Sequence, residues 1–73
     1  MNFTIAPNPT SGLLKIQSSV PYNSLRVLEI GGHEIVKSTE NSDLLNLTHL
    51  ASGVYLIEIH TDQGPLRQRF VKN

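Results

Sequence analysis

The sequence predicts an all-β fold, a sandwich or barrel of short strands, on three observations. Glycine and proline, nine residues together among 73, recur at intervals too short for several long helices. The segments between them are rich in β-branched and aliphatic residues, and turn signals recur about every eight to twelve residues, as in sandwiches and barrels. Several segments alternate apolar and polar residues with a period of two, which indicates half-buried strands.

Two strands are predicted in the N-terminal part of the chain. Phe3 to Ala6 is predicted as an edge strand that ends at Pro7, because proline cannot donate a backbone hydrogen bond to a neighbouring strand. Leu13 to Gln17 is predicted as the second strand, with Leu14 and Ile16 facing the core and the polar residues facing solvent.

A stiff corner, Pro7 to Gly12, is predicted between these two strands. Its two prolines fix φ at their own positions and force the residues before them, Asn8 included, into extended geometry. The corner is therefore expected to be stiff without needing hydrogen bonds. Residues 10–12 then allow a tight reversal into the next strand.

Two hairpins are predicted further along the chain. Their strands are Leu25 to Ile30 with Glu34 to Lys37, and Val54 to His60 with Leu66 to Val71. The first hairpin turns at Gly31-Gly32-His33, where glycine suits a positive φ. The second turns at residues 61–64, which have the composition of a turn.

The second hairpin carries a pair of side chains that could serve chemistry. Glu58 and His60 lie two residues apart on one strand face and could reach a common ion or proton, while the alternating apolar residues face the core. That outer face is predicted to be solvated, where polar side chains need no special role. Because His33 and His49 lie in other turns, no third ligand is fixed, and the sequence predicts neither a metal site nor a catalytic site.

The segment from Asp43 to Gly53 fits two structures. A helix would use Asp43 as its N-cap, apolar residues at spacings of three and four, and Gly53 as its stop. A short strand would place Leu45 and Leu47 inward and continue into a turn at residues 48–50. The local pattern leaves both structures open.

Composition excludes several classes of function. Six basic and six acidic side chains give no net charge, so no broad field attracts nucleic acid or an anionic membrane. The absence of cysteine excludes a thiol nucleophile, a disulfide framework and a thiolate metal site. The longest apolar run, Val54 to Ile57, is too short to span a bilayer. Nucleophile-elbow and phosphate-loop motifs are also missing, so neither an enzyme nor a bound cofactor is predicted.

The C-terminal end of the chain is basic. Half of the cations, Arg67, Arg69 and Lys72, lie in the last seven residues, which contain no acid. One interpretation is an edge strand that charge protects from pairing with other sheets. The other is a small basic feature that a partner contacts.

Five motifs occur in a fixed order along the chain. They are Pro7-Asn8-Pro9-Thr10-Ser11-Gly12, Val27 to Ile30 running into Gly32, Leu45-Asn46-Leu47-Thr48 with Leu50, Gly53-Val54-Tyr55, and Phe70-Val71-Lys72. Together they resemble the type A C-terminal sorting domain of the type IX secretion system of Bacteroidota. The resemblance spans nearly the whole chain, with two departures: Ala6 stands where an aromatic residue is common, and Asn73 follows the terminal lysine.

The resemblance implies an immunoglobulin-like sandwich of about seven antiparallel strands. It implies a strand and a turn for residues 43–53, with Leu45, Leu47 and Leu50 packed inward. Residues 1–73 would form a single sorting domain at the C-terminal end of a larger exported protein. Such a domain is non-catalytic, binds neither cofactor nor nucleic acid, and does not insert into the membrane.

The resemblance also implies a route and a set of partners. The domain would reach the periplasm folded, joined to an upstream cargo domain in the same polypeptide. The outer-membrane type IX translocon would recognise it, and a surface sortase would then remove it. The cargo would end at the cell surface or be secreted.

Nine residues are the candidates for recognition by the translocon: Pro7, Asn8, Pro9, Gly12, Gly53, Tyr55, Arg67, Arg69 and Lys72. Two of them have a structural alternative, in which Gly53 adopts a positive φ and Tyr55 places its ring in the core with the hydroxyl at the rim. Addition of a partner strand to an exposed sheet edge is a further expected mode of binding.

A competing function is an immunoglobulin-like accessory or adhesion module that binds carbohydrate or protein. Modules that bind carbohydrate usually expose aromatic residues for stacking. The chain has two tyrosines and two phenylalanines, and Tyr22 alone is expected to be exposed.

Overall fold

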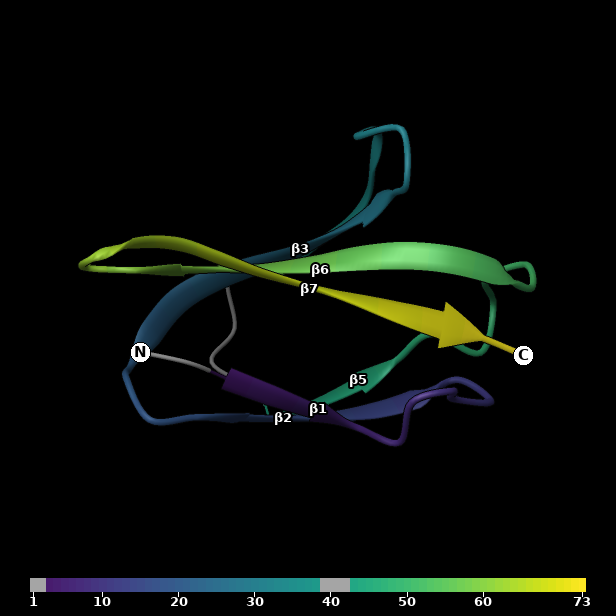
Figure 1. The fold of residues 1–73 in the computed structure, drawn as a ribbon, viewed down its shortest axis with the longest axis horizontal. Coiled ribbons are helices and arrows are strands. Elements are labelled where there is room, and N and C mark those ends of the chain that lie inside the picture. The colour runs from purple at the N-terminus through teal and green to yellow at the C-terminus, as the bar shows by residue number, and fades with distance from the viewer. Residues whose placement is uncertain (1–2, 39–42) are drawn as a thin grey trace.

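The computed structural model describes residues 3–38 and 43–73, and within them seven strands form two antiparallel sheets. The strands are β1 (Phe3–Ala6), β2 (Leu13–Ser18), β3 (Tyr22–Glu29), β4 (Glu34–Ser38), β5 (Leu44–Asn46), β6 (Gly53–Thr61) and β7 (Gly64–Lys72). One sheet has the order β1-β2-β5 and the other the order β4-β3-β6-β7. The two sheets stack as the layers of a sandwich (Figure 1), which confirms the predicted fold class.

The core lies between the two sheets, and most of its buried members come from alternating positions of the strands. Its buried members are Phe3, Leu14, Ile16, Tyr22, Leu25, Val27, Leu45, Leu47, Tyr55, Ile57, Ile59 and Phe70. The predicted inward positions in β2 and β6 are therefore confirmed. Side chains at the positions between them point out of the sandwich, because successive residues of a strand face opposite sides of the sheet.

The segment from residue 43 to residue 53 contains a strand, so the helical alternative is wrong. β5 pairs with β2, and Leu45 lies opposite Leu14 in the core. The backbone N–H of Leu47 donates to the carbonyl of Gly12 at 2.6 Å, which continues the contact beyond β5. Because this pairing buries both Leu45 and Leu47, tertiary packing overrides a helix-like local pattern.

Both predicted hairpins are confirmed. β3 and β4 form the first, which turns through Gly32 at a φ of +96°, and β6 and β7 form the second, which turns into Gly64 at a φ of +111°. β3 begins at Tyr22, ahead of the predicted start, because its first residues pair with the end of β6. β6 therefore lies in the middle of the larger sheet, with β3 on one side and β7 on the other.

Candidate recognition site

The corner between β1 and β2 is hydrogen-bonded to the end of β7. Asn8 Oδ1 accepts a hydrogen bond from the backbone N–H of Val71 at 3.0 Å, and Asn8 Nδ2 donates to the carbonyl of Arg69 at 3.4 Å. The N–H of Thr10 donates to the carbonyl of Val71 at 2.9 Å, and its carbonyl accepts from the N–H of Asn73 at 2.8 Å. We call these contacts between residues 8–10 and 69–73 the terminal clasp.

The terminal clasp adds to one expectation and limits another. The corner forms hydrogen bonds in addition to its two prolines, because the outer edge of β7 presents backbone groups that need partners. Asn8 and Thr10 supply those partners at Arg69, Val71 and Asn73. A partner strand could therefore add to this part of the edge only by displacing the corner.

Two residues hold the corner in shape. The Thr10 side chain is fully buried, donates to the carbonyl of Leu13 at 2.6 Å and accepts from the N–H of Gly12 at 3.0 Å. Gly12 has a φ of +144°, and a Cβ there would lie 2.4 Å from Cγ2 of Thr48. Glycine is therefore required at position 12 by both backbone conformation and space.

The Gly53-Val54-Tyr55 motif reaches the same end of the sandwich from β6. Gly53 lies opposite Lys72 and Tyr55 opposite Phe70 in the β6–β7 register. The Tyr55 ring stacks on that of Phe70 with centroids 5.7 Å apart, and its hydroxyl donates to the carbonyl of Ala51 at 2.6 Å. The structural alternative for Tyr55, a ring in the core with the hydroxyl at the rim, is thus confirmed.

The structural alternative for Gly53 is wrong. Its φ lies outside the left-handed region, and a Cβ there would sit at ordinary contact distance, 3.8 Å, from the ring of Tyr55. The β6–β7 ladder needs only extended backbone at this position. Neither conformation nor space inside the domain therefore requires glycine at position 53.

Lys72 is the point at which the three motifs meet. Its backbone pairs with Gly53 of β6 and forms a parallel bridge with Thr10 of the corner. Its side chain is buried, and Nζ donates to the carbonyl of Asn73 at 3.0 Å. In Figure 1 the β1–β2 corner, the β5–β6 connection and the C-terminus lie at the same end of the sandwich.

The fold thus brings together eight of the nine candidate residues. The group, which we call the motif end, consists of Pro7, Asn8, Pro9, Gly12, Gly53, Tyr55, Arg69 and Lys72. Arg67 lies apart from it, farther along β7 and opposite Glu58. The three C-terminal cations therefore do not form one basic feature, because Lys72 is buried and Arg67 belongs to a second cluster.

That second cluster is a row of charged residues on the outer face of the four-stranded sheet. Lys37, Arg26, Glu58 and Arg67 are successive partners across β4, β3, β6 and β7. Arg26 Nε donates to Glu58 Oε1 at 2.7 Å, His60 Nε2 lies 2.7 Å from the same oxygen, and Arg67 Nε donates to Oε2. The pairing of Glu58 with His60 was within reach of sequence reasoning, whereas the role of Arg26 was missed, because no local pattern gives the register between β3 and β6.

Glu58 lies on the outer face, as the sequence predicts, but its own side chain is not solvated, because only 1% of it is exposed beneath the basic side chains around it. Burial by itself raises the pKa of this carboxyl, but hydrogen bonds from Arg26, Arg67 and His60 outweigh it and lower the pKa to about 2. Glu58 is therefore ionised at neutral pH and accepts hydrogen bonds from the basic side chains around it. Within residues 3–38 and 43–73, no group of three potential metal ligands is present.

All four aromatic side chains are buried. Phe3, Tyr55 and Phe70 lie in the core, and so does Tyr22, with 8% of its surface exposed. The expectation that Tyr22 is exposed is wrong, because β3 begins at this residue and turns it inward. The sandwich thus offers no aromatic platform on which a carbohydrate could stack.

The comparison with known families decides between the two functions. The family model of the secretion system C-terminal sorting domain, the Por or type IX secretion tail, matches residues 4–73. The chain belongs to this family. No sequence match is found among curated proteins. The chain is therefore a non-catalytic sorting signal of the type IX system, which interacts with the secretion machinery and directs secretion across the outer membrane. Within the described ranges no helix is long and apolar enough to span a membrane.

Proposed function

We propose that the type IX machinery recognises this sorting domain through the motif end. The observation that supports this is the meeting of three sequence motifs at Lys72, whose backbone lies between Gly53 and Thr10. These motifs are far apart in the chain, and only the folded domain places them side by side. A receptor that reads the motif end would therefore select folded domains.

The proposal extends to the route of the parent protein. Residues 1–73 act as one domain at the C-terminal end of a larger exported protein whose cargo lies upstream. The domain passes through the periplasm folded and is recognised by the outer-membrane translocon. A surface sortase then removes it, and the cargo stays at the cell surface or is released.

A reporter fusion tests the sorting function. Residues 1–73 are placed behind a signal peptide and a folded reporter in a host with a type IX system. The reporter is expected at the cell surface or in the medium, and the same reporter without the domain is expected to stay in the periplasm. Equal retention of both reporters would contradict the proposed route.

A matched pair of surface substitutions tests the motif end. Deleting residues 67–73 would be uninformative, because it also removes Phe70, which is fully buried in the core. Arg69→Glu instead changes the exposed side chain of the residue whose carbonyl accepts from Asn8, and Lys15→Glu makes the same charge change on the other sheet. We expect Arg69→Glu to reduce export while Lys15→Glu does not. Equal export by both folded variants would place the contact elsewhere.

A further inference from the structure

The charges of this neutral chain are distributed unevenly over its surface. Cross-strand partners share a sheet face, so the register places four of the six cations on the outer face of the four-stranded sheet: Lys37, Arg26, Arg67 and Arg69. Among the described residues, the acids on that face are Glu34 and Glu58. The face is therefore net basic, although the chain as a whole carries no net charge.

The carboxylate of Glu58 fixes the position of the basic groups around it. Both of its oxygens accept hydrogen bonds, and the donors come from β3 and β7, as well as from His60 on β6 itself. Arg26 and Arg67 use Nε for this contact, and their side chains remain 32% and 56% exposed. Basic groups held in this way lose little side-chain entropy when an anion binds.

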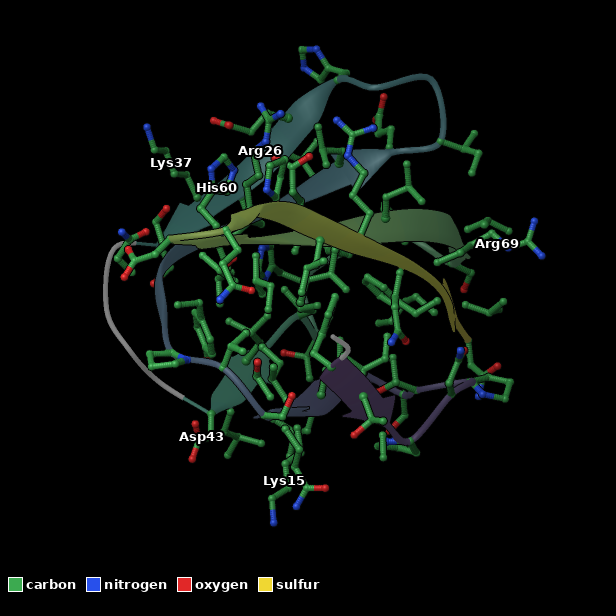
Figure 2. The ribbon with its side chains drawn as sticks, turned by 60° about the vertical axis from the view of Figure 1, so that its left-hand side comes forward. Lys15, Arg26, Lys37, Asp43, His60 and Arg69 are labelled. Carbon is green, nitrogen blue, oxygen red and sulfur yellow. The ribbon has the colours of Figure 1, made fainter. Side chains whose placement is uncertain are left out.

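A groove lies beside this row, at the β4 edge of the sheet. It has a volume of about 280 Å³, and its polar lining is Ser24, Arg26, Glu34, Lys37 and His60. Figure 2 shows Arg26, Lys37 and His60 gathered on one side of the molecule, with Lys15 far from them. Among the described residues, Lys37 has no ion-pair partner, and the contact of Arg26 with Glu34 is long, at 3.4 Å.

We propose that this groove binds an acidic segment of a partner protein, whose carboxylates contact Lys37 and Arg26. The charge of the lining favours an anionic group such as a carboxylate, since Arg26 and Lys37 are cationic and Ser24 offers a hydroxyl donor, against the single carboxylate of Glu34. The partner's carboxylate would take the place of Glu34 on Arg26. The groove is separate from the motif end, so the proposal goes beyond recognition there.

A titration with a defined acidic peptide tests the proposal. The ¹⁵N-labelled 73-residue chain is titrated with hexaglutamate at low ionic strength, and with hexaglutamine as the uncharged control. Hexaglutamate is expected to shift the amide signals of Ser24, Arg26 and Lys37, and hexaglutamine is not. Shifts spread evenly over both sheets, or equal shifts with the two peptides, would overturn the proposal.

Three variants test whether binding depends on the charges that line the groove. Lys37→Gln is expected to weaken hexaglutamate binding about threefold, the size expected for one exposed charge contact. Lys15→Gln removes the same charge from the other sheet and is expected to leave binding unchanged. Glu34→Gln removes the competing carboxylate and is expected to tighten binding by about twofold. Equal weakening by both lysine variants would overturn the proposal, and so would weaker binding by Glu34→Gln.

An anionic membrane is the alternative ligand for the groove, and binding to vesicles tests it. The chain is mixed with vesicles of phosphatidylglycerol and phosphatidylcholine, and the bound fraction is measured by sedimentation. We expect no sedimentation that depends on Lys37. Binding to these vesicles that is lost in Lys37→Gln, without a shift by hexaglutamate, would overturn the assignment to a protein partner.

Discussion

The side chain of Asn8 takes the place of a neighbouring strand for Val71, 63 positions away in the sequence. Asn8 Oδ1 accepts the backbone hydrogen bond that Val71 directs away from β6, at 3.0 Å. This contact joins the first motif of the chain to the last. A side chain of the same domain thus satisfies the backbone edge of β7 at this point. The motif end is therefore intact only while both ends of the chain are folded together.

Removal of the Asn8 side chain should loosen the terminal clasp. Asn8→Ala deletes hydrogen bonds to Val71 and Arg69, and we expect it to lower the free energy of unfolding by about 1 kcal/mol. Urea unfolding measures this change, and hydrogen exchange of the Val71 amide should become faster. Asn23→Ala, at an exposed position of β3, is the control and should leave both quantities unchanged. Equal effects of the two substitutions would contradict the clasp.

A side chain at position 12 should be costly. Gly12 has a φ of +144°, and a Cβ there would lie 2.4 Å from Thr48, whereas Gly31 has open space around it and no positive φ. We expect Gly12→Ala to lower the free energy of unfolding by roughly 2 kcal/mol. Gly31→Ala should change it by less than about 0.5 kcal/mol. Thermal unfolding of the two variants checks this, and similar melting temperatures would show that the corner tolerates a side chain.

Glu58 should make the stability of the domain depend on pH in the acid range. Its pKa is about 2 in the folded chain against an ordinary 4.5, so its contribution is complete above pH 4.5 and disappears as the pH falls toward 2. That shift corresponds to about 3 kcal/mol. Glu58→Gln should lose a comparable amount at pH 7 and show a flatter profile between pH 4.5 and 2.

The pH profile is measured by urea unfolding at a series of pH values. Glu29→Gln, at an exposed position of β3, is the matched control because it removes a carboxylate that forms no ion pair within the described residues. The native chain and Glu29→Gln should show the same acid-range slope. A Glu58→Gln profile parallel to theirs would show that the Glu58 carboxylate does not carry the stabilisation.

Substitution of Gly53 should separate recognition from stability. A Cβ at this position meets the Tyr55 ring at ordinary distance, so Gly53→Ala should leave the free energy of unfolding within about 0.5 kcal/mol of the native value. If a receptor approaches the backbone closely here, as the proposed function requires, reporter export should fall by about tenfold. Pulse-labelled secretion of the fusion measures this fall. Unchanged export by a stable variant would remove Gly53 from the contacted surface.

Local pattern was sufficient for most of the fold because the strands alternate and their turns carry glycine. Leu14 and Ile16 could be placed inward, and the hairpin that turns at Gly64 could be located, since period-two alternation and turn composition are local properties. The segment at Leu45 could not be decided in this way. Its choice of strand over helix depends on pairing with Leu14, which is a contact between distant parts of the chain.

The candidate site shows the same division. Its motifs could be read along the chain, and the resemblance that they carry is confirmed by the family comparison. The burial of Glu58 under Arg26 and Arg67 could not be read, since it requires the register of three strands. Nor could the burial of Tyr22 and Lys72 be read, or the separation of Arg67 from the other two C-terminal cations.

The sequence by itself determined that this chain is a small β-sandwich with the motifs of a sorting signal, because strand alternation, turn residues and motif order are properties of the linear sequence. Only the tertiary structure decided which residues meet. Side-chain hydrogen bonds such as that of Asn8 to Val71, and ion pairs such as that of Arg26 with Glu58, join positions far apart in the chain. Their partners are set by sheet register and by the need to satisfy edge and buried polar groups.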